Sequence, residues 1–93
     1  MSNNTNAFEI AFGNIVRTHL AAMTTSPGER VWISDLAKHM EMDLDVVKKA
    51  LWNARGNGYS LTRTDIVMKG EQAKAQASLI TYLNATFDAV YAK

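Results

Sequence analysis

Apolar residues between positions 7 and 23 recur at mostly three- and four-residue spacing, which is the period of an amphipathic helix. Ile10 and Val16 fall outside this stripe, so the predicted helix is apolar on more than one face and needs more than one neighbour. Residues 1–6 are polar, and we expect a flexible tail there. The following TTSPGE run ends the helix, because Pro27 and Gly28 favour a turn.

Residues 33–55 predict two short helices joined by a tight turn. The apolar residues of the first helix fall at i, i+3, i+4 and i+7 and form one face: Ile33, Leu36, Ala37 and Met40. Asp43 is a suitable N-cap for a second helix that begins at residue 44. The inward face of that second helix is formed by Val47, Ala50, Leu51 and Ala54. Glycines at 56 and 58 favour its end.

Two elements are predicted for the rest of the chain. Residues 59–69 mix β-branched and aromatic residues, which favours a short β-hairpin with strands at 60–62 and 66–68. Residues 71–92 contain no proline or glycine and are rich in alanine, which favours one long helix. The 93 residues therefore predict a single, mainly α domain of the α+β class, with a small hairpin and long terminal helices.

The run LAKHMEMDLDVVKKAL, residues 36–51, with Gly58 beyond it, resembles the winged helix-turn-helix, a DNA-binding fold. Leu36 and the small Ala37 match the apolar and close-approach positions of the first motif helix. The run IVMKGE, residues 66–71, resembles the last wing strand and helix start of multiple-antibiotic-resistance-type and PadR-like transcriptional regulators. One departure is Glu41, which occupies a turn position often held by glycine, so the backbone there must avoid positive φ or tolerate strain.

Positive charge is concentrated around the second motif helix. The net charge is only +1, but residues 46–64 carry Lys48, Lys49, Arg55 and Arg63 and no acidic residue. The resemblance implies that helix 44–55 is the recognition helix and enters the major groove of double-stranded DNA. The candidate DNA-binding residues are the outward side chains of this helix and the expected wing tip: Asp45, Lys48, Lys49, Trp52, Asn53, Arg55, Arg63 and Thr64.

Trp52 leaves two readings open. A large indole on the outward face is costly to leave in water, so Tyr59, the wing or the N-terminal segment is expected to cover it. Alternatively, it contacts DNA or is a hot spot for a protein partner.

The first and last predicted helices have more apolar positions than one neighbour covers. We expect a homodimer through Phe8, Phe12, Ile15, Ile80, Leu83, Phe87 and Val90. The alternative is a monomer in which these positions are all used within one chain.

Several classes of function find no support in the sequence. There is no cysteine, no apolar run long enough for a membrane span, and no N-terminal pattern of a signal peptide, so we expect a cytoplasmic protein. His19 and His39 lack a spacing partner, so no metal site or cofactor is expected. No catalytic set is recognisable, which argues against an enzyme.

Two functions remain. The first is a transcriptional regulator that represses by occupying an operator. The alternative is a winged-helix protein-interaction module, an inhibitor or adaptor of the kind that viruses and mobile elements encode, which uses the Trp52 face.

Overall fold

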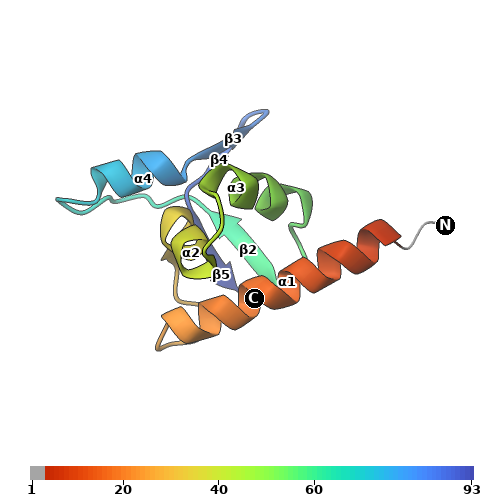
Figure 1. Cartoon of the computed structure of the whole chain (residues 1–93). Helices are drawn as coiled ribbons and strands as arrows, with labels where there is room; N and C mark the ends of the chain where they lie inside the picture. Colours follow the sequence, from red (N-terminus) through yellow and green to blue (C-terminus); the bar gives the residue numbers. More distant parts are fainter. Residues whose placement is uncertain (1–3) are drawn as a thin grey trace.

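The computed structural model describes residues 4–93 and is a mixed α/β structure (Figure 1). The described chain contains four helices, a three-stranded antiparallel sheet and a separate two-stranded hairpin. In chain order the elements are α1 (Asn4–Met23), β1 (Val31–Trp32), α2 (Ile33–Met40), α3 (Leu44–Asn53), β2 (Tyr59–Thr62), α4 (Gln72–Ser78), β3 (Ile80–Tyr82), β4 (Ala85–Phe87) and β5 (Ala89–Ala92).

The N-terminal half follows the pattern of the sequence. α1 begins at Asn4 rather than at residue 7, so residues 4–6 belong to the helix, while residues 1–3 of the expected tail lie outside the described chain. α2 buries the predicted apolar face, with Ile33 and Leu36 fully enclosed. The Asp43 carboxylate caps α3 by accepting a hydrogen bond from the Val46 amide at 3.2 Å.

The turn between α2 and α3 contains a non-glycine residue in the left-handed backbone conformation. Glu41 has φ 56° and ψ 43°, a conformation that costs a residue with a Cβ on the order of 1 kcal/mol. Two hydrogen bonds close the turn: the Glu41 amide donates to the Lys38 carbonyl, and the Met42 amide donates to the Ala37 carbonyl, each at 3.1 Å. These bonds satisfy carbonyls at the end of α2, which explains how the turn holds without glycine.

The predicted helix over 71–92 is wrong. Only Gln72–Ser78 is helical, and residues 80–92 form three strands instead. Ile80, Thr81, Thr86 and Val90 are β-branched, and such side chains fit a pleated, half-buried surface well. β5 is also the central strand of the sheet. It pairs with β1 on one edge and with β2 on the other, so its backbone groups are hydrogen-bonded on both sides.

The predicted hairpin within 59–69 is also wrong in its second strand. β2 forms as expected, but its partner is β5, with Leu61 opposite Val90. Residues 63–71 form no strand and lead into α4. The two sheet partners are therefore separated by a long segment that contains α4 and the β3–β4 hairpin.

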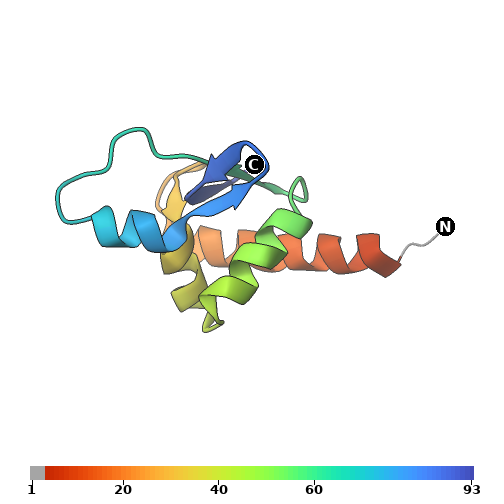
Figure 2. The same ribbon diagram turned by 90° about the horizontal axis from the view of Figure 1, so that it is seen from above.

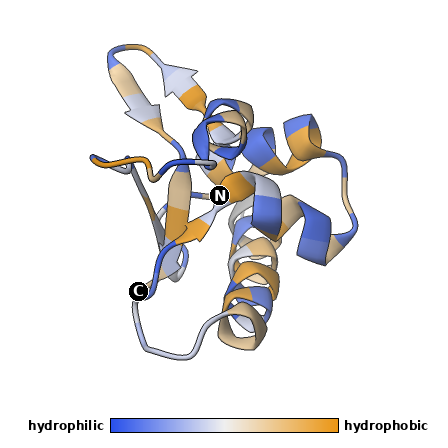
Figure 3. Cartoon of the chain, turned by 90° about the vertical axis from the view of Figure 1, so that its left-hand side faces the viewer, coloured by the Kyte–Doolittle hydropathy of each residue, from blue (hydrophilic) through white to orange (hydrophobic). Residues whose placement is uncertain are grey.

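The core lies where the first three helices meet the three-stranded sheet (Figure 2). Leu20, Ile33, Leu51 and Val90 are all fully or almost fully buried there. Figure 3 shows hydrophobic and hydrophilic segments alternating along the helices, as in amphipathic helices. Among the described residues, none of the helices combines the length and apolarity that a membrane crossing requires.

Candidate functional site

The outward face of α3 lies between two projecting parts of the molecule. Figure 1 shows the β3–β4 hairpin on one side of α3 and α1 on the other, with the N-terminal end of α1 extending past the body. Val47, Leu51 and Ala54 of α3 are buried, whereas Asp45, Lys49 and Asn53 are exposed, as the helical periodicity predicts. Lys48 and Trp52, which were also predicted to face outward, are half-buried.

Two hollows flank α3, and Lys49 and Asn53 line both of them. The first, of about 440 Å³, lies between α3 and β3; α3 contributes Asp45, Lys48, Lys49, Trp52 and Asn53, and β3 contributes Ile80, Thr81 and Tyr82. The second, of about 510 Å³, lies toward α1 and is lined by Phe8, Glu9, Val46, Lys49, Ala50, Asn53 and Ala54. Lys49 and Asn53 therefore form the ridge between the hollows. We call this ridge with its two hollows the α3 face.

Trp52 is half-buried by the hairpin. Its ring packs on Tyr82, with centroids 4.6 Å apart and planes at 31°, and on Phe87, with centroids 5.7 Å apart. Neither Tyr59 nor the N-terminal segment provides this cover, contrary to expectation. Tyr59 is instead in the core, where its hydroxyl donates to the Leu51 carbonyl at 2.7 Å.

Arg55 is held against Trp52. Its guanidinium carbon lies 3.9 Å from the centroid of the Trp52 ring, and its Nη1 donates to the Trp52 carbonyl at 2.7 Å. The guanidinium is therefore fixed at the C-terminal end of α3, where it also satisfies a carbonyl at the end of the helix. Arg55 as a whole nevertheless remains exposed to solvent.

Arg63 and Thr64 do not lie at a hairpin tip, and that prediction is wrong. They follow β2 and line a different hollow with residues of α4, and the Thr64 amide donates to the buried Asp88 carboxylate at 2.8 Å. Neither residue lines the hollows of the α3 face. The error follows from assigning the second wing strand to residues 66–68 rather than to β5.

The hairpin tip beside α3 is formed by residues that were predicted to be helical. Tyr82 pairs with Ala85, which leaves Leu83 and Asn84 as a two-residue turn. Leu83 has φ 55° and is 87% exposed, so it is both conformationally strained and surrounded by water. The signal was present as ITY and ATF separated by two residues, a hairpin pattern that the alanine-rich residues before it obscured.

The residues predicted for dimerisation do not form one surface. Phe12, Ile80 and Val90 are buried within the chain, and Phe87 packs on Trp52. Leu83 lies at the tip of the β3–β4 hairpin and not in the helix that had been predicted. Of the seven residues, Phe8 and Ile15 remain as exposed apolar side chains of α1, 67% and 48% exposed.

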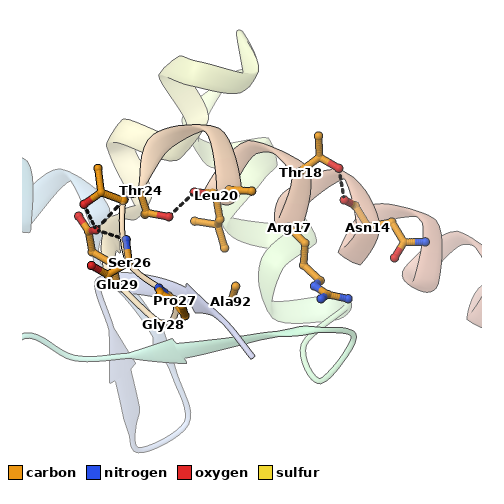
Figure 4. Close-up of a pocket in the computed structure, with 12 residues that line it drawn as sticks. Asn14, Arg17, Thr18, Leu20, Thr24, Ser26, Pro27, Gly28, Glu29 and Ala92 are labelled. Atoms are coloured by element: carbon orange, nitrogen blue, oxygen red, sulfur yellow. Dashed lines mark hydrogen bonds between the residues drawn. The ribbon is translucent and has the colours of Figure 1, made fainter.

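A further hollow, of about 700 Å³, lies between α1, the 24–29 loop and Ala92 (Figure 4). Most of its polar groups have partners within the chain. Thr24 donates to the Leu20 carbonyl at 2.8 Å, and the Glu29 carboxylate accepts from the Thr25 and Ser26 amides. The Thr25 hydroxyl also donates to the same carboxylate at 3.4 Å, so these bonds close the loop.

His19 and His39 are brought together by the fold. Their Nδ1 atoms lie 2.7 Å apart, one ring donating to the other, although the residues are 20 positions apart on different helices. The absence of a close sequence spacing hid this pair. Across residues 4–93, no group of three or more histidine, aspartate, glutamate or cysteine side chains gathers in one place.

The Tyr59 hydroxyl has a shifted pKa. Burial raises its pKa well above the ordinary tyrosine value, and the negative charge of Glu9 adds to this effect while Arg55 opposes it. The hydroxyl is in the core and bonded to a helix carbonyl, so its role is structural.

Comparison of the chain with protein-family models, with curated proteins and with solved structures gave no match.

Proposed function

We propose that the protein is a winged-helix DNA-binding protein that represses transcription by occupying an operator through α3. The element order supports this proposal. α1, β1, α2, the turn and α3 follow the layout of that fold, and β2 and β5 take the place of the strands that flank its wing. Residues 63–88 replace a short wing loop.

The observation that carries the proposal is the α3 ridge. Lys49 and Asn53 are exposed side by side, one turn apart, on the part of α3 that projects between the two hollows. A lysine in this position reaches phosphates or guanine edges, and an asparagine reads adenine through two hydrogen bonds. Lys48 and Arg55 lie toward the hairpin and suit phosphate contacts.

The flanking elements suit a groove-binding helix. An α-helix fits the major groove of B-DNA, which is about 12 Å wide, and neighbouring arms then reach the sugar–phosphate backbone on either side. The β3–β4 hairpin is fixed to α3 by the Trp52 stack, so its tip holds a defined position beside the ridge. On this proposal, Trp52 anchors the hairpin and does not itself read a base.

We further propose that a homodimer forms through α1. Phe8, Ala11, Ile15, Thr18 and Ala22 are all exposed and recur at spacings of three and four residues. Such a seam suits pairing with a second copy of α1. A two-fold dimer would present two α3 helices to half-sites about 34 Å apart.

The test is selection of bound sequences from a random duplex pool by the full chain, at about 50 mM salt, where phosphate contacts are strongest. The proposal expects enrichment of one motif, arranged as two half-sites if the protein is a dimer. Asn53→Ala is expected to relax the preference at one base-pair position of each half-site and to leave the other positions unchanged. Absence of any binding at this salt would contradict the proposal.

A second candidate, a protein-interaction module, is favoured by a different observation. The ends of both arms are apolar: Leu83 is 87% exposed beside the half-exposed Tyr82, and Phe8 is exposed on α1. An inhibitor or adaptor would bind through these side chains and not through the lysines. Retention of a purified partner by the Lys48→Ala/Lys49→Ala variant, and its loss with Leu83→Ser, would favour this candidate.

A further inference from the structure

The histidine pair lies at the boundary between α1 and α2, away from the α3 face. His19 and His39 meet with ring centroids 5.0 Å apart and ring planes at 84°. His19 is half-buried and His39 is exposed, so both rings can be reached from solvent. Neither residue lines a hollow of the α3 face.

The contact between the two Nδ1 atoms has a chemical consequence. At 2.7 Å, one imidazole must donate its Nδ1 proton and the other must accept it. When both rings carry their proton on Nε2, two nitrogen lone pairs face the same small volume. This arrangement is that of a bidentate ligand for a metal ion, because neutral imidazole nitrogen is a common metal ligand.

We infer that His19 and His39 form a two-histidine site for a first-row transition-metal ion, with Cu(II) and Ni(II) preferred over Zn(II). Two nitrogens that each lie about 2.0 Å from an ion are about 2.8 Å apart at a 90° angle and about 3.3 Å apart at the tetrahedral angle. The 2.7 Å separation fits neighbouring positions of a tetragonal Cu(II) or Ni(II) site. The general affinity order of divalent ions also favours copper, and nickel has the same geometric preference.

The site would have two protein ligands and would leave its other positions to water. Each ring would have to turn about χ2 so that its lone pair points at the ion and not along the line between the two nitrogens, and that torsion is soft for histidine. The bound ion would join α1 to the last turn of α2, directly before the Glu41 turn that leads to α3. Because the two ligands meet only in the folded chain, binding would stabilise the fold.

The test titrates the full chain with copper, nickel, zinc and magnesium salts in a non-coordinating buffer near neutral pH. Calorimetry is expected to give one ion per chain, in the affinity order copper, nickel, zinc, with no binding of magnesium. Thermal unfolding is expected to shift upward with the same order. His19→Gln and His39→Gln should each lower the affinity roughly tenfold or more. Lys38→Ala, in the same turn as His39, is the matched control and should bind like the wild type.

Three results would overturn the inference: wild-type affinity in either histidine variant, a stoichiometry of one ion per two chains, or tighter binding of zinc than of nickel. A second measurement uses the unmodified chain and so does not depend on the folding of a variant. Substoichiometric Ni(II) should broaden the imidazole proton resonances of His19 and His39 first, and lowering the pH should reverse this effect. Broadening of other residues alone would also overturn it.

Discussion

The Trp52 ring lies 4.6 Å from the Tyr82 ring, measured between centroids, and this contact joins α3 to the β3–β4 hairpin. The two residues are 30 positions apart in the sequence, so the stack is a tertiary contact. It holds the small hairpin against α3. A two-stranded hairpin is marginally stable alone in water. The position of its tip beside the α3 ridge therefore depends on this pair and on Phe87.

Tyr82→Ala should loosen the hairpin. Removing one ring of the stack is expected to lower the free energy of unfolding by about 1–2 kcal/mol, from lost burial of a half-exposed side chain and the lost aromatic pair. Urea unfolding monitored by far-ultraviolet circular dichroism would measure it. Tyr82→Phe keeps the ring and is the control; an equal loss in both variants would contradict a role for stacking.

Leu83→Gly should stabilise the protein. Leu83 holds a positive φ of 55°, which glycine adopts without steric cost. Relief of about 1 kcal/mol or more from the backbone exceeds the entropy that glycine adds to the unfolded chain, so a net gain of about 0.5 kcal/mol is expected. Leu83→Ala keeps the Cβ and should show no such gain. A lower midpoint of urea unfolding for Leu83→Gly than for Leu83→Ala would contradict the reading of the turn.

Stability should fall steeply above pH 10 because of Tyr59. The hydroxyl ionises near pH 10 when unfolded, whereas burial raises its pKa in the folded state. Between these values the folded state binds the extra proton, so the free energy of unfolding decreases as pH rises, by up to about 1.4 kcal/mol per unit. Tyr59→Phe cannot ionise and should lack this dependence. Denaturant unfolding of both proteins between about pH 8 and 11 measures the difference; parallel curves would contradict it.

Ile15→Glu should separate the proposed dimer. A charge in the middle of the α1 seam cannot be buried against a second copy without a large desolvation cost. Sedimentation velocity is expected to show a shift from dimer to monomer. Ile10 is similarly exposed on α1 but lies off the seam, so Ile10→Glu is the matched control and should remain dimeric. A monomeric wild type would refute the dimer and leave DNA binding by a single α3 open to test.

The sequence predicted the first half of the fold because its signals are local. Ile33, Leu36 and Ala37 define the inner face of α2 by spacing alone, and the Asp43 cap marks the start of α3. Each feature depends on residues within one or two helical turns. The orientation of Lys49 and Asn53 followed from the same periodicity.

The second half could not be predicted because its signals are non-local. Val90 falls on a helical stripe with Phe87 and Leu83, yet it lies at the centre of the sheet between Val31 and Leu61. Val31 is 59 positions away and Leu61 is 29 positions away, and nothing near Val90 indicates them. For the same reason the sequence could predict that Trp52 needs cover but not that Tyr82 provides it, and it could not predict the meeting of His19 with His39.

DNA binding through α3 can be tested by the salt dependence of duplex binding by the Lys48→Ala/Lys49→Ala variant. Fluorescence anisotropy with a labelled duplex, at several salt concentrations, gives the slope of log affinity against log salt. Each lysine that contacts a phosphate should reduce the magnitude of that slope by about 1 when it is removed. Lys69→Ala removes an exposed lysine outside the α3 face and is the matched control. Weaker binding and a shallower slope are expected for the α3 variant, and wild-type behaviour is expected for the control. Equal slopes for all three proteins would contradict DNA binding through α3.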